Sequence, residues 1–382
     1  MNGPMPDASP ASTAPDATPP ASRRLISLDA LRGFDMFWII GGEGIAHAAA
    51  ELTGWSVLVW LAGQMHHPEW HGFAFYDLIF PLFLFMAGVA MPFSFEKRLA
   101  DGGTKQELVR HSIIRGLVLV LFGMIYNGLL EFNWPETRLA SVLGRIGLAY
   151  MFAALIALHF GVRARAVWIA GILIGYWAAL RFIPVPGFGA GDLSPGHTLT
   201  DWVDRQLVPG RLYQGDRDPE GLFGTIPAIA TALAGNLTGT LLKSSRFSGY
   251  AKAVLMIAVG LVCLAAAWVW NFDFPINKNL WSSSFVLHCA GWSLIFLAIF
   301  YLVIDVWQFR KWAFFFIVIG SNSILIYMAQ AFVDFEYTTE FFFGGALKHA
   351  GAYQALLGAI AFVFVEWLLL YLLYKKRIFL KV

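Results

Sequence analysis

Long apolar stretches recur along the whole chain, and they restrict its fold more than any other feature. A helix needs about 20 apolar residues to cross a hydrocarbon core of about 30 Å, and these stretches reach that length. The sequence therefore predicts an all-α polytopic membrane protein with about ten transmembrane helices and two long periplasmic loops. The predicted spans are Ile26–Ala50, Phe73–Phe95, His111–Leu130, Ala140–Phe160, Ala166–Ile183, Leu222–Leu242, Ala251–Trp270, Leu280–Ile304, Trp312–Val333 and Tyr353–Tyr374.

Composition supports the membrane class. Of the 382 residues, 58% are hydrophobic and only 14% are charged, whereas a soluble domain carries charge on about a quarter of its residues. The net charge of +2 gives no reason to expect nucleic acid as a partner. Both cysteines, Cys263 and Cys289, lie in apolar runs, where we interpret them as small buried hydrophobic residues.

The N-terminal residues differ from the rest of the chain. Residues Met1–Ser22 are rich in Pro, Ala, Ser and Thr, and such a composition predicts disorder. Arg23 and Arg24 resemble a twin-arginine export signal, but the charged Asp29 and Arg32 that follow do not suit such a signal. We expect residues 1–24 to form a disordered cytoplasmic tail and residues 25–382 to form one transmembrane domain.

Lysine and arginine alternate between the connections of the predicted spans. The connections on one side of the membrane are rich in lysine and arginine, and they include the Lys97–Arg110 connection and the Lys375–Lys381 end. The positive-inside rule therefore places both termini in the cytoplasm. Two connections on the opposite side, Glu51–Gly72 and Pro184–Gly221, are too long for simple turns. Long loops on a rigid scaffold often carry binding sites.

The first predicted span carries a polar face. Asp29, Arg32, Met36, Ile40 and Glu43 follow one another at spacings of three and four, so they share one side of a helix. Charged side chains are costly in lipid, and this face is therefore predicted to point into the bundle. Arg32 either pairs with Asp29 as an interfacial anchor or binds an anionic ligand group through its forked donors.

The second predicted span begins with a carboxylate. Asp77 lies near its start, and His67 precedes Asp77 by ten residues in a segment that can fold back. An imidazole oriented by a carboxylate is a common general-base arrangement. His66, His67 and His71 can also be interpreted as interfacial loop histidines or metal ligands. Their spacing matches no standard ligand pattern, and we expect no metal.

Later spans carry further polar and small residues. Arg145 lies early in the fourth span, and Gly320–Ser323 lies within the ninth. No phosphate-binding loop, dinucleotide fingerprint, nucleophile elbow or zinc signature occurs in the sequence. These patterns leave two classes open, a membrane enzyme and a transporter. The sixth span has a stripe of small residues that predicts close helix packing, namely Gly224, Ala228, Thr231, Gly235 and Gly239.

Several short motifs, taken in order, resemble one family. They are SLDALRGF at Ser27–Phe34, HPEWHG at His67–Gly72, DLIFP at Asp77–Pro81, GRIGLAY at Gly144–Tyr150, DPEGLFGT at Asp218–Thr225, NKNLW at Asn277–Trp281 and NSILIY at Asn322–Tyr327. Together they resemble heparan-alpha-glucosaminide N-acetyltransferase and its bacterial relatives. The latter include NagX-type inner-membrane proteins associated with N-acetylglucosamine use. The resemblance covers the chain from about Arg24 to the C-terminus.

The resemblance implies acetyl-CoA as donor, a glucosamine-type amine as acceptor and a place in the bacterial inner membrane. The family's catalytic histidine lies in a His-x-x-Trp-x-Gly motif, which here selects His67, and its carboxylate partner falls on Asp77. The chain is expected to lack the extra lumenal domain of the lysosomal enzyme, so a heparan polymer is not the expected acceptor. The resemblance also implies a homodimer.

These expectations assign roles to particular residues. His67 is the expected base on the acceptor amine, or the nucleophile that carries the acetyl group, and Asp77 orients it. The rival interpretation is an amino-sugar or N-acetylglucosamine permease, because transporters also interrupt helices near polar groups. The His67–Asp77 pair near one face favours chemistry. The candidates for coenzyme A are Arg32, Arg145, Lys278 and Asn322, and those for the sugar are Trp70, Glu220, Asn277 and Asn279.

Overall fold

The computed structural model describes residues 25–380, so the predicted tail over residues 1–24 lies outside the described residues. Within residues 25–380 the regular secondary structure is helical, with loops between the helices and two isolated β-bridges, which confirms the all-α fold. The α-helices are α1 Ile26–Phe37, α2 Glu43–Thr53, α3 Ser56–Gly63, α4 Tyr76–Ala100, α5 Lys105–Tyr126, α6 Val142–His159, α7 Val162–Phe182, α8 Leu199–Leu207, α9 Thr225–Lys243, α10 Gly249–Trp270, α11 Ser283–Phe300, α12 Phe314–Ser321, α13 Ser323–Ala329, α14 Phe335–Leu347 and α15 Gln354–Lys375.

The long helices make this a multi-pass membrane protein. Eight helices within residues 25–380 are long and apolar enough to cross a membrane, and the bent pair α12–α13 adds a ninth when it is counted as one span. These nine correspond to the second to tenth spans predicted from the sequence. The count differs from the expected ten because of the first predicted span, Ile26–Ala50.

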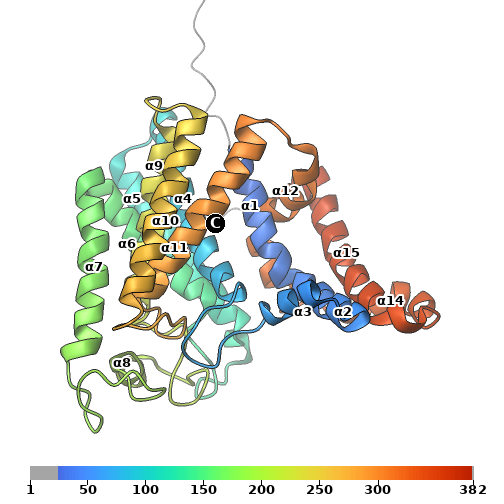
Figure 1. Ribbon diagram of the computed structural model, residues 1–382, viewed down its shortest axis with the longest axis horizontal. Coiled ribbons are helices and arrows are strands. Elements are labelled where there is room, and N and C mark those ends of the chain that lie inside the picture. Colours follow the sequence, from blue (N-terminus) through green and yellow to red (C-terminus); the bar gives the residue numbers. More distant parts are fainter. Residues whose placement is uncertain (1–24, 381–382) are drawn as a thin grey trace, which may run out of the picture.

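That first span is broken near its middle. Ile40 and Gly41 leave the helical conformation, and Gly41 has a φ of 112°, which glycine adopts without a steric penalty. Figure 1 shows α2 and α3 lying across the ends of the long helices, beside α14, rather than continuing α1. The apolar pattern continues through the break, so hydrophobic periodicity does not reveal it.

The centre of the bundle is the contact between α4 and α9. Gly235 and Gly239 of α9 lie so close to the α4 backbone at Phe85 and Val89 that a Cβ atom on either glycine would overlap with a carbonyl group. Gly88 of α4 approaches the α9 backbone in the same way. This confirms the close packing predicted from the small-residue stripe, and it fixes α4, the helix that carries Asp77.

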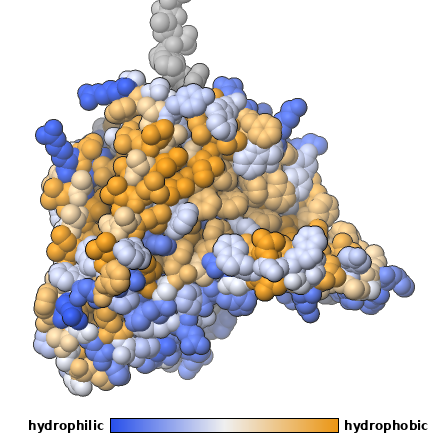
Figure 2. Space-filling model, viewed as in Figure 1, coloured by the Kyte–Doolittle hydropathy of each residue, from blue (hydrophilic) through white to orange (hydrophobic). Residues whose placement is uncertain are grey.

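We call the end of the bundle that carries both long loops the outer end, and the opposite end the inner end. The two loops touch each other, since Trp70 Nε1 donates a hydrogen bond of 2.8 Å to the Leu193 carbonyl. The outer end lies at the bottom of Figure 1, with α8 below the long helices. Figure 2 shows apolar residues on the side of the bundle and hydrophilic residues gathered at the outer end. This pattern is the one expected of a bundle surrounded by lipid.

Candidate active site

His67 and Asp77 meet at the outer end. Asp77 occupies the second position of α4 and is 1% exposed, whereas His67 lies in the loop before that helix. His67 Nδ1 is 2.6 Å from Asp77 Oδ1, and Asp77 Oδ2 accepts a hydrogen bond of 3.0 Å from the Ala74 backbone N–H. Since a carboxylate can only accept, this contact assigns the imidazole proton to Nδ1 and leaves Nε2 as the basic nitrogen.

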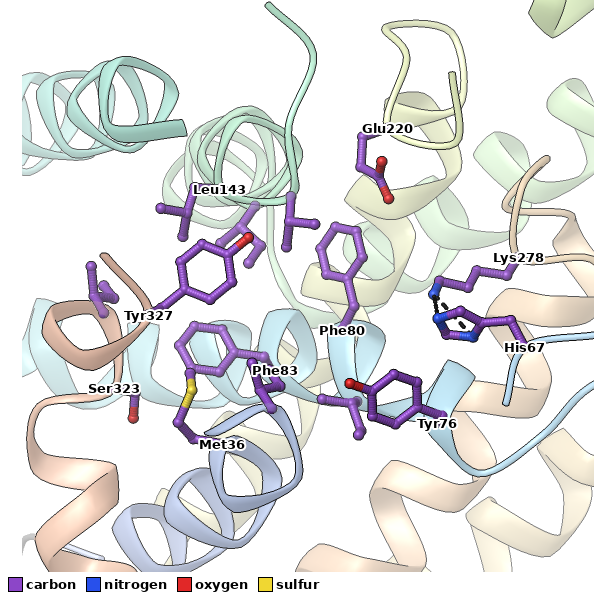
Figure 3. Close-up of a pocket in the computed structure, with 15 residues that line it drawn as sticks. Met36, His67, Tyr76, Phe80, Phe83, Leu143, Glu220, Lys278, Ser323 and Tyr327 are labelled. Atoms are coloured by element: carbon purple, nitrogen blue, oxygen red, sulfur yellow. Dashed lines mark hydrogen bonds between the residues drawn. The ribbon is translucent and has the colours of Figure 1, made fainter. Parts of the chain in front are cut away.

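Lys278 is the third member of the group. It comes from the loop between α10 and α11, and its Nζ lies 2.9 Å from His67 Nε2 and 3.8 Å from Asp77 Oδ1 (Figure 3). Burial lowers the pKa of Lys278 from its usual 10.5, and the nearby Asp77 carboxylate opposes that effect. The imidazole is therefore held between a carboxylate on one nitrogen and an amine on the other.

The neighbouring histidines have other partners. His66 Nδ1 lies 3.2 Å from the Ala62 carbonyl oxygen, and its ring packs against His47 at a centroid distance of 4.7 Å. His71 Nδ1 accepts a hydrogen bond of 3.1 Å from Asn277 Nδ2, and burial lowers the pKa of His71 from 6.5. Within residues 25–380, no three His, Cys, Asp or Glu side chains are grouped as ligands for a metal ion.

Two cavities meet at this group. One has a volume of about 170 Å³ and extends into the bundle between mostly apolar side chains. Met36, Phe83 and Tyr327 lie at its far side from His67 in Figure 3. The other has a volume of about 410 Å³ and lies among the outer loops, with many polar groups in its wall. The imidazole can therefore be reached from two sides. The residues that line both cavities are His67, Val142, Glu220 and Lys278.

Glu220 faces both cavities from the turn that precedes α9. Arg138 holds this turn, because its Nη2 contacts Glu220 and its Nε and Nη2 donate to Asp218 at 2.8 and 2.6 Å. Arg145 holds it from the bundle side through a hydrogen bond of 3.0 Å from Nη2 to the Gly221 carbonyl. Two guanidinium groups thus determine where the Glu220 carboxylate points.

The other residues expected at the sugar divide into two groups. Trp70 and Asn279 line the polar cavity directly. Asn277 is fully buried and shapes the loop before α11, because its Oδ1 accepts a hydrogen bond of 2.9 Å from the Leu280 N–H. Its amide also donates a hydrogen bond to His71, and Asn277 lines neither cavity.

Of the residues expected at coenzyme A, the structure brings only Lys278 to His67. Arg32 lies in α1 with its guanidinium 3.5 Å from Asp29 and lines neither cavity. Arg145 is 1% exposed and also lines neither cavity. Its guanidinium lies over the Trp281 ring, 5.0 Å from the ring centroid.

Asn322 lies at the break between α12 and α13, where the two helices differ in direction by 59°, and its side chain bonds to the backbone after α15. Its Nδ2 donates to the Ile378 carbonyl at 2.9 Å, and its Oδ1 accepts from the Leu380 N–H at 3.0 Å. Both polar ends of the Asn322 side chain are therefore used to hold the chain that follows α15.

Arg138 is a residue of the site that was not predicted from the sequence. It lies in the loop between α5 and α6, and 80 residues separate it from Asp218. No motif surrounds it, so only the folded structure reveals that it lines the polar cavity and holds Glu220. The one available signal was that Arg138 is among the few cations on the predicted outer side.

Comparison with known proteins supports the resemblance found in the motifs. A family model described as a domain of unknown function, DUF5009, matches residues 24–192. Heparan-alpha-glucosaminide N-acetyltransferase of Mus musculus is 27% identical over 375 residues, which covers 83% of this chain and 56% of that relative. The enzyme of the same name from Homo sapiens is 28% identical over 441 residues, which covers 98% of this chain and 62% of that relative. The resemblance is confirmed, and the chain spans less than two thirds of the length of these relatives.

Proposed function

Because the chain is a relative of the heparan-alpha-glucosaminide N-acetyltransferases, we propose that it transfers the acetyl group of acetyl-CoA to the amine of a glucosamine-type sugar. One observation carries this proposal. The His67–Asp77 pair, with its 2.6 Å contact, lies where an apolar cavity and a polar cavity meet. The names of the relatives indicate the reaction class, and the pair supplies a base that two substrates can reach.

In the proposed reaction His67 is the general base. The acceptor nitrogen bonds to the acetyl carbon and gives its proton to His67 Nε2, while Asp77 stabilises the imidazolium that forms. The carbon–sulfur bond then breaks, and the imidazolium returns the proton to the departing thiolate. A second order of events, in which Nε2 first takes the acetyl group and then passes it to the amine, uses the same residues.

Lys278 is proposed to stabilise the negative charge that develops on the acetyl oxygen. Its Nζ lies 2.9 Å from His67 Nε2, so it is close to any carbonyl group that is positioned against that nitrogen. A donor that is already in place in a site with little water lowers the barrier to attack on the carbonyl. An anionic oxygen would also offset the burial that lowers the pKa of this lysine.

The two cavities are proposed to receive the two substrates. The apolar cavity, walled by side chains such as Phe80 and Phe83, suits the uncharged arm that carries the acetyl thioester. The polar cavity suits the sugar, since Glu220 can accept a hydrogen bond from the neutral amine and Trp70 offers an aromatic surface to a sugar ring.

The proposed orientation places the inner end in the cytoplasm and His67 at the periplasmic face of a bacterial inner membrane. Its support is the excess of lysine and arginine in the connections of the inner end, such as Lys97, Arg98 and Lys243. A periplasmic reporter fused after Val382 is expected to stay inactive. An active reporter there would reverse the orientation and move His67 to the cytoplasmic face.

The test of the activity is coenzyme A release by the purified protein in lipid nanodiscs, measured with and without glucosamine. His67→Ala is expected to lower the rate by about 10² to 10⁴-fold, the usual contribution of a general base. Acetyl-CoA binding, measured by calorimetry, should be largely retained, because the other side chains that line the apolar cavity stay in place.

His66→Ala is the matched control, since His66 packs against His47 and lines neither cavity. Its rate should stay close to that of the wild type. The proposal fails if His66→Ala is the inactive variant, or if the wild type releases no coenzyme A with any amino sugar. In that case, uptake of labelled glucosamine into proteoliposomes would test the permease interpretation.

A further inference from the structure

A third cavity lies at the inner end, away from His67. It has a volume of about 940 Å³, is open to the surface, and is bordered by the ends of α4, α6 and α9, the start of α7 and the turn after α9. Pro92, in its wall, follows Asp77 by 15 residues of α4, which is about 22 Å at a rise of 1.5 Å per residue. A molecule bound in this inner cavity is therefore separate from the chemistry proposed at His67.

Cations outnumber anions in the wall of the inner cavity. Arg165, Lys243 and Arg246 line it together with one carboxylate, Glu96, which pairs with Lys243 at 3.0 Å. The guanidinium of Arg246 forms no ion pair with any carboxylate in residues 25–380, and the one hydrogen bond of this residue runs from its backbone N–H to Ser244 Oγ. A positive charge is therefore left over in the cavity.

Arg165 is held in a fixed position at the other side of the cavity. Its guanidinium donates to the Ala157 and Phe160 carbonyls at the end of α6, each at 2.8 Å, and to Asn236 Oδ1 at 3.0 Å. An arginine has five N–H donors, so two of them remain for a further acceptor. The geometry of the guanidinium is thus set before any ligand arrives, which reduces the entropy that binding would cost.

The rest of the wall combines hydroxyl groups with apolar side chains. Thr240, Ser244 and Ser245 contribute hydroxyls near the cations, while Leu99 and Val162 lie at the rim and are 49% and 52% exposed. Hydroxyls and guanidinium groups are the donors that bind phosphate oxygens. An exposed apolar rim beside them, at the end of membrane-spanning helices, is suited to acyl chains.

We propose that the inner cavity binds a phosphate-bearing anion, with Arg165 and Arg246 as its cationic ligands. The headgroup of an anionic phospholipid from the surrounding leaflet is the source that uses both the cations and the apolar rim. Basic pockets between transmembrane helices are known to bind such headgroups. This site is independent of the acetyl transfer proposed above, and it would link lipid composition to the stability of the α4–α9 contact.

The test is native mass spectrometry of the protein extracted from phosphatidylcholine bilayers that contain phosphatidylglycerol. The wild type is expected to retain phosphatidylglycerol in preference to phosphatidylcholine. Arg246→Gln should reduce the retained phosphatidylglycerol by about fivefold, the effect of one cation near a membrane surface. Arg246 is exposed, and its side chain forms no hydrogen bond or ion pair with residues 25–380, so this variant should fold normally. Arg165→Gln should reduce retention further.

Arg163→Gln is the matched control, because Arg163 is an exposed cation two residues before Arg165 and does not line the cavity. A second arm measures the binding of glycerol phosphate to lipid-depleted protein by calorimetry. If glycerol phosphate binds in a way that depends on Arg246 and is not displaced by phosphatidylglycerol, the anion site is supported, and its ligand is a soluble phosphate compound and not a lipid. Equal lipid loss from Arg163→Gln and Arg246→Gln, or no effect of Arg246→Gln in either arm, would overturn the proposal.

Discussion

Asp77 and Asp204 are both carboxylates buried at the outer end, with exposed fractions of 1% and 0%, but their surroundings differ. Asp77 contacts an imidazole, accepts a backbone hydrogen bond and has the Lys278 amine 3.8 Å away. Asp204, in α8, accepts a hydrogen bond of 3.1 Å from the Phe223 N–H through Oδ1. Its Oδ2 has no hydrogen-bond partner among residues 25–380 and lies against Gly221.

The comparison shows that burial of a carboxylate does not by itself indicate chemistry. Asp77 is buried, but the imidazole that it orients is 45% exposed at the side chain and open to two cavities. Asp204 lines neither cavity, and its contacts are with the turn that leads into α9. What distinguishes the two is a partner that connects the buried charge to a space in which a substrate can bind.

The largest effect should come from Asp77→Asn. The Ala74 N–H needs an acceptor, so the asparagine oxygen is expected to face Ala74 and its NH₂ group to face His67. His67 Nδ1 must then accept, which moves the imidazole proton to Nε2 and removes the base. We expect the rate of acetyl transfer to fall by about 10² to 10⁴-fold.

The readout is coenzyme A release under saturating acetyl-CoA, compared with His67→Ala and the double variant. The double variant should be little slower than His67→Ala alone, because residues that act as a unit fail together. If the rate loss of the double variant equals the product of the two single losses, Asp77 and His67 act separately. Asp77 would then not differ from Asp204 by acting through an imidazole.

Lys278→Met should have the next largest effect. Methionine keeps much of the length of the side chain but cannot donate a hydrogen bond to the developing oxyanion. We expect kcat to fall by roughly 10²-fold, the usual effect of losing one such donor, while the KM for glucosamine changes little. Lys348→Met, at an exposed position after α14, is the control for loss of a positive charge at the outer end. A change confined to KM would make Lys278 a binding residue.

A third substitution, Arg138→Gln, tests whether Arg138 must hold Glu220 in place for the sugar to bind. It removes the guanidinium that contacts both Asp218 and Glu220, so Glu220 should no longer be directed into the cavities. We expect the KM for the amino sugar to rise about tenfold, which corresponds to the loss of one charge-assisted hydrogen bond. The KM for acetyl-CoA should stay the same. Equal increases in both KM values would indicate that the outer loops have collapsed.

The features of this chain that could be predicted from its sequence are those with a local signal. Spans from α4 onward are predicted because an apolar run of helical length has few alternatives in a membrane. A carboxylate at the start of a span after a histidine-rich loop pointed to Asp77 and a histidine partner, and the family motif selected His67 among the three histidines. The contact between His67 and Asp77 is found in the structure, and their catalytic role stays a proposal. The break at Gly41 was missed, since the residues around it are apolar and a change in backbone direction leaves no trace in hydrophobicity.

Roles that depend on tertiary contacts were not predictable in the same way. Lys278 and Arg145 were both expected at the phosphates of coenzyme A, because a cation in or near a membrane span suggests an anionic partner. In the structure, Lys278 reaches an imidazole and Arg145 reaches a backbone carbonyl and an indole ring. Sequence spacing indicates which helix carries a charge, but not which group across the bundle will meet it.

Asp204→Asn should have the smallest effect on activity and a stability effect that depends on pH. Burial raises the pKa of Asp204 from 3.8 to about 6, although the Phe223 N–H and the positive charge of Arg145 oppose the shift. A carboxyl whose pKa is higher in the folded state stabilises the fold fully only below its unfolded pKa. That contribution is lost as the pH rises through about 6. At neutral pH the wild type therefore carries the cost of a buried carboxylate, on the order of 1–3 kcal/mol.

The measurement is the thermal midpoint of unfolding in detergent at pH 4.5 and pH 7.5. Asparagine does not titrate and can still accept from the Phe223 N–H, so Asp204→Asn should be more stable than the wild type at pH 7.5. The difference in thermal midpoint between the variant and the wild type should be smaller at pH 4.5. Asp192→Asn is the control, because hydrogen bonds from Ser194 lower the pKa of Asp192 below 3.8. Its carboxylate therefore contributes to stability at both pH values, and the destabilisation caused by its substitution should change little between pH 4.5 and pH 7.5. If the gap for Asp204→Asn is the same at both pH values, Asp204 does not titrate between them. If instead the variant loses acetyl transfer as severely as Asp77→Asn, Asp204 belongs to the reacting group and the distinction between the two carboxylates fails.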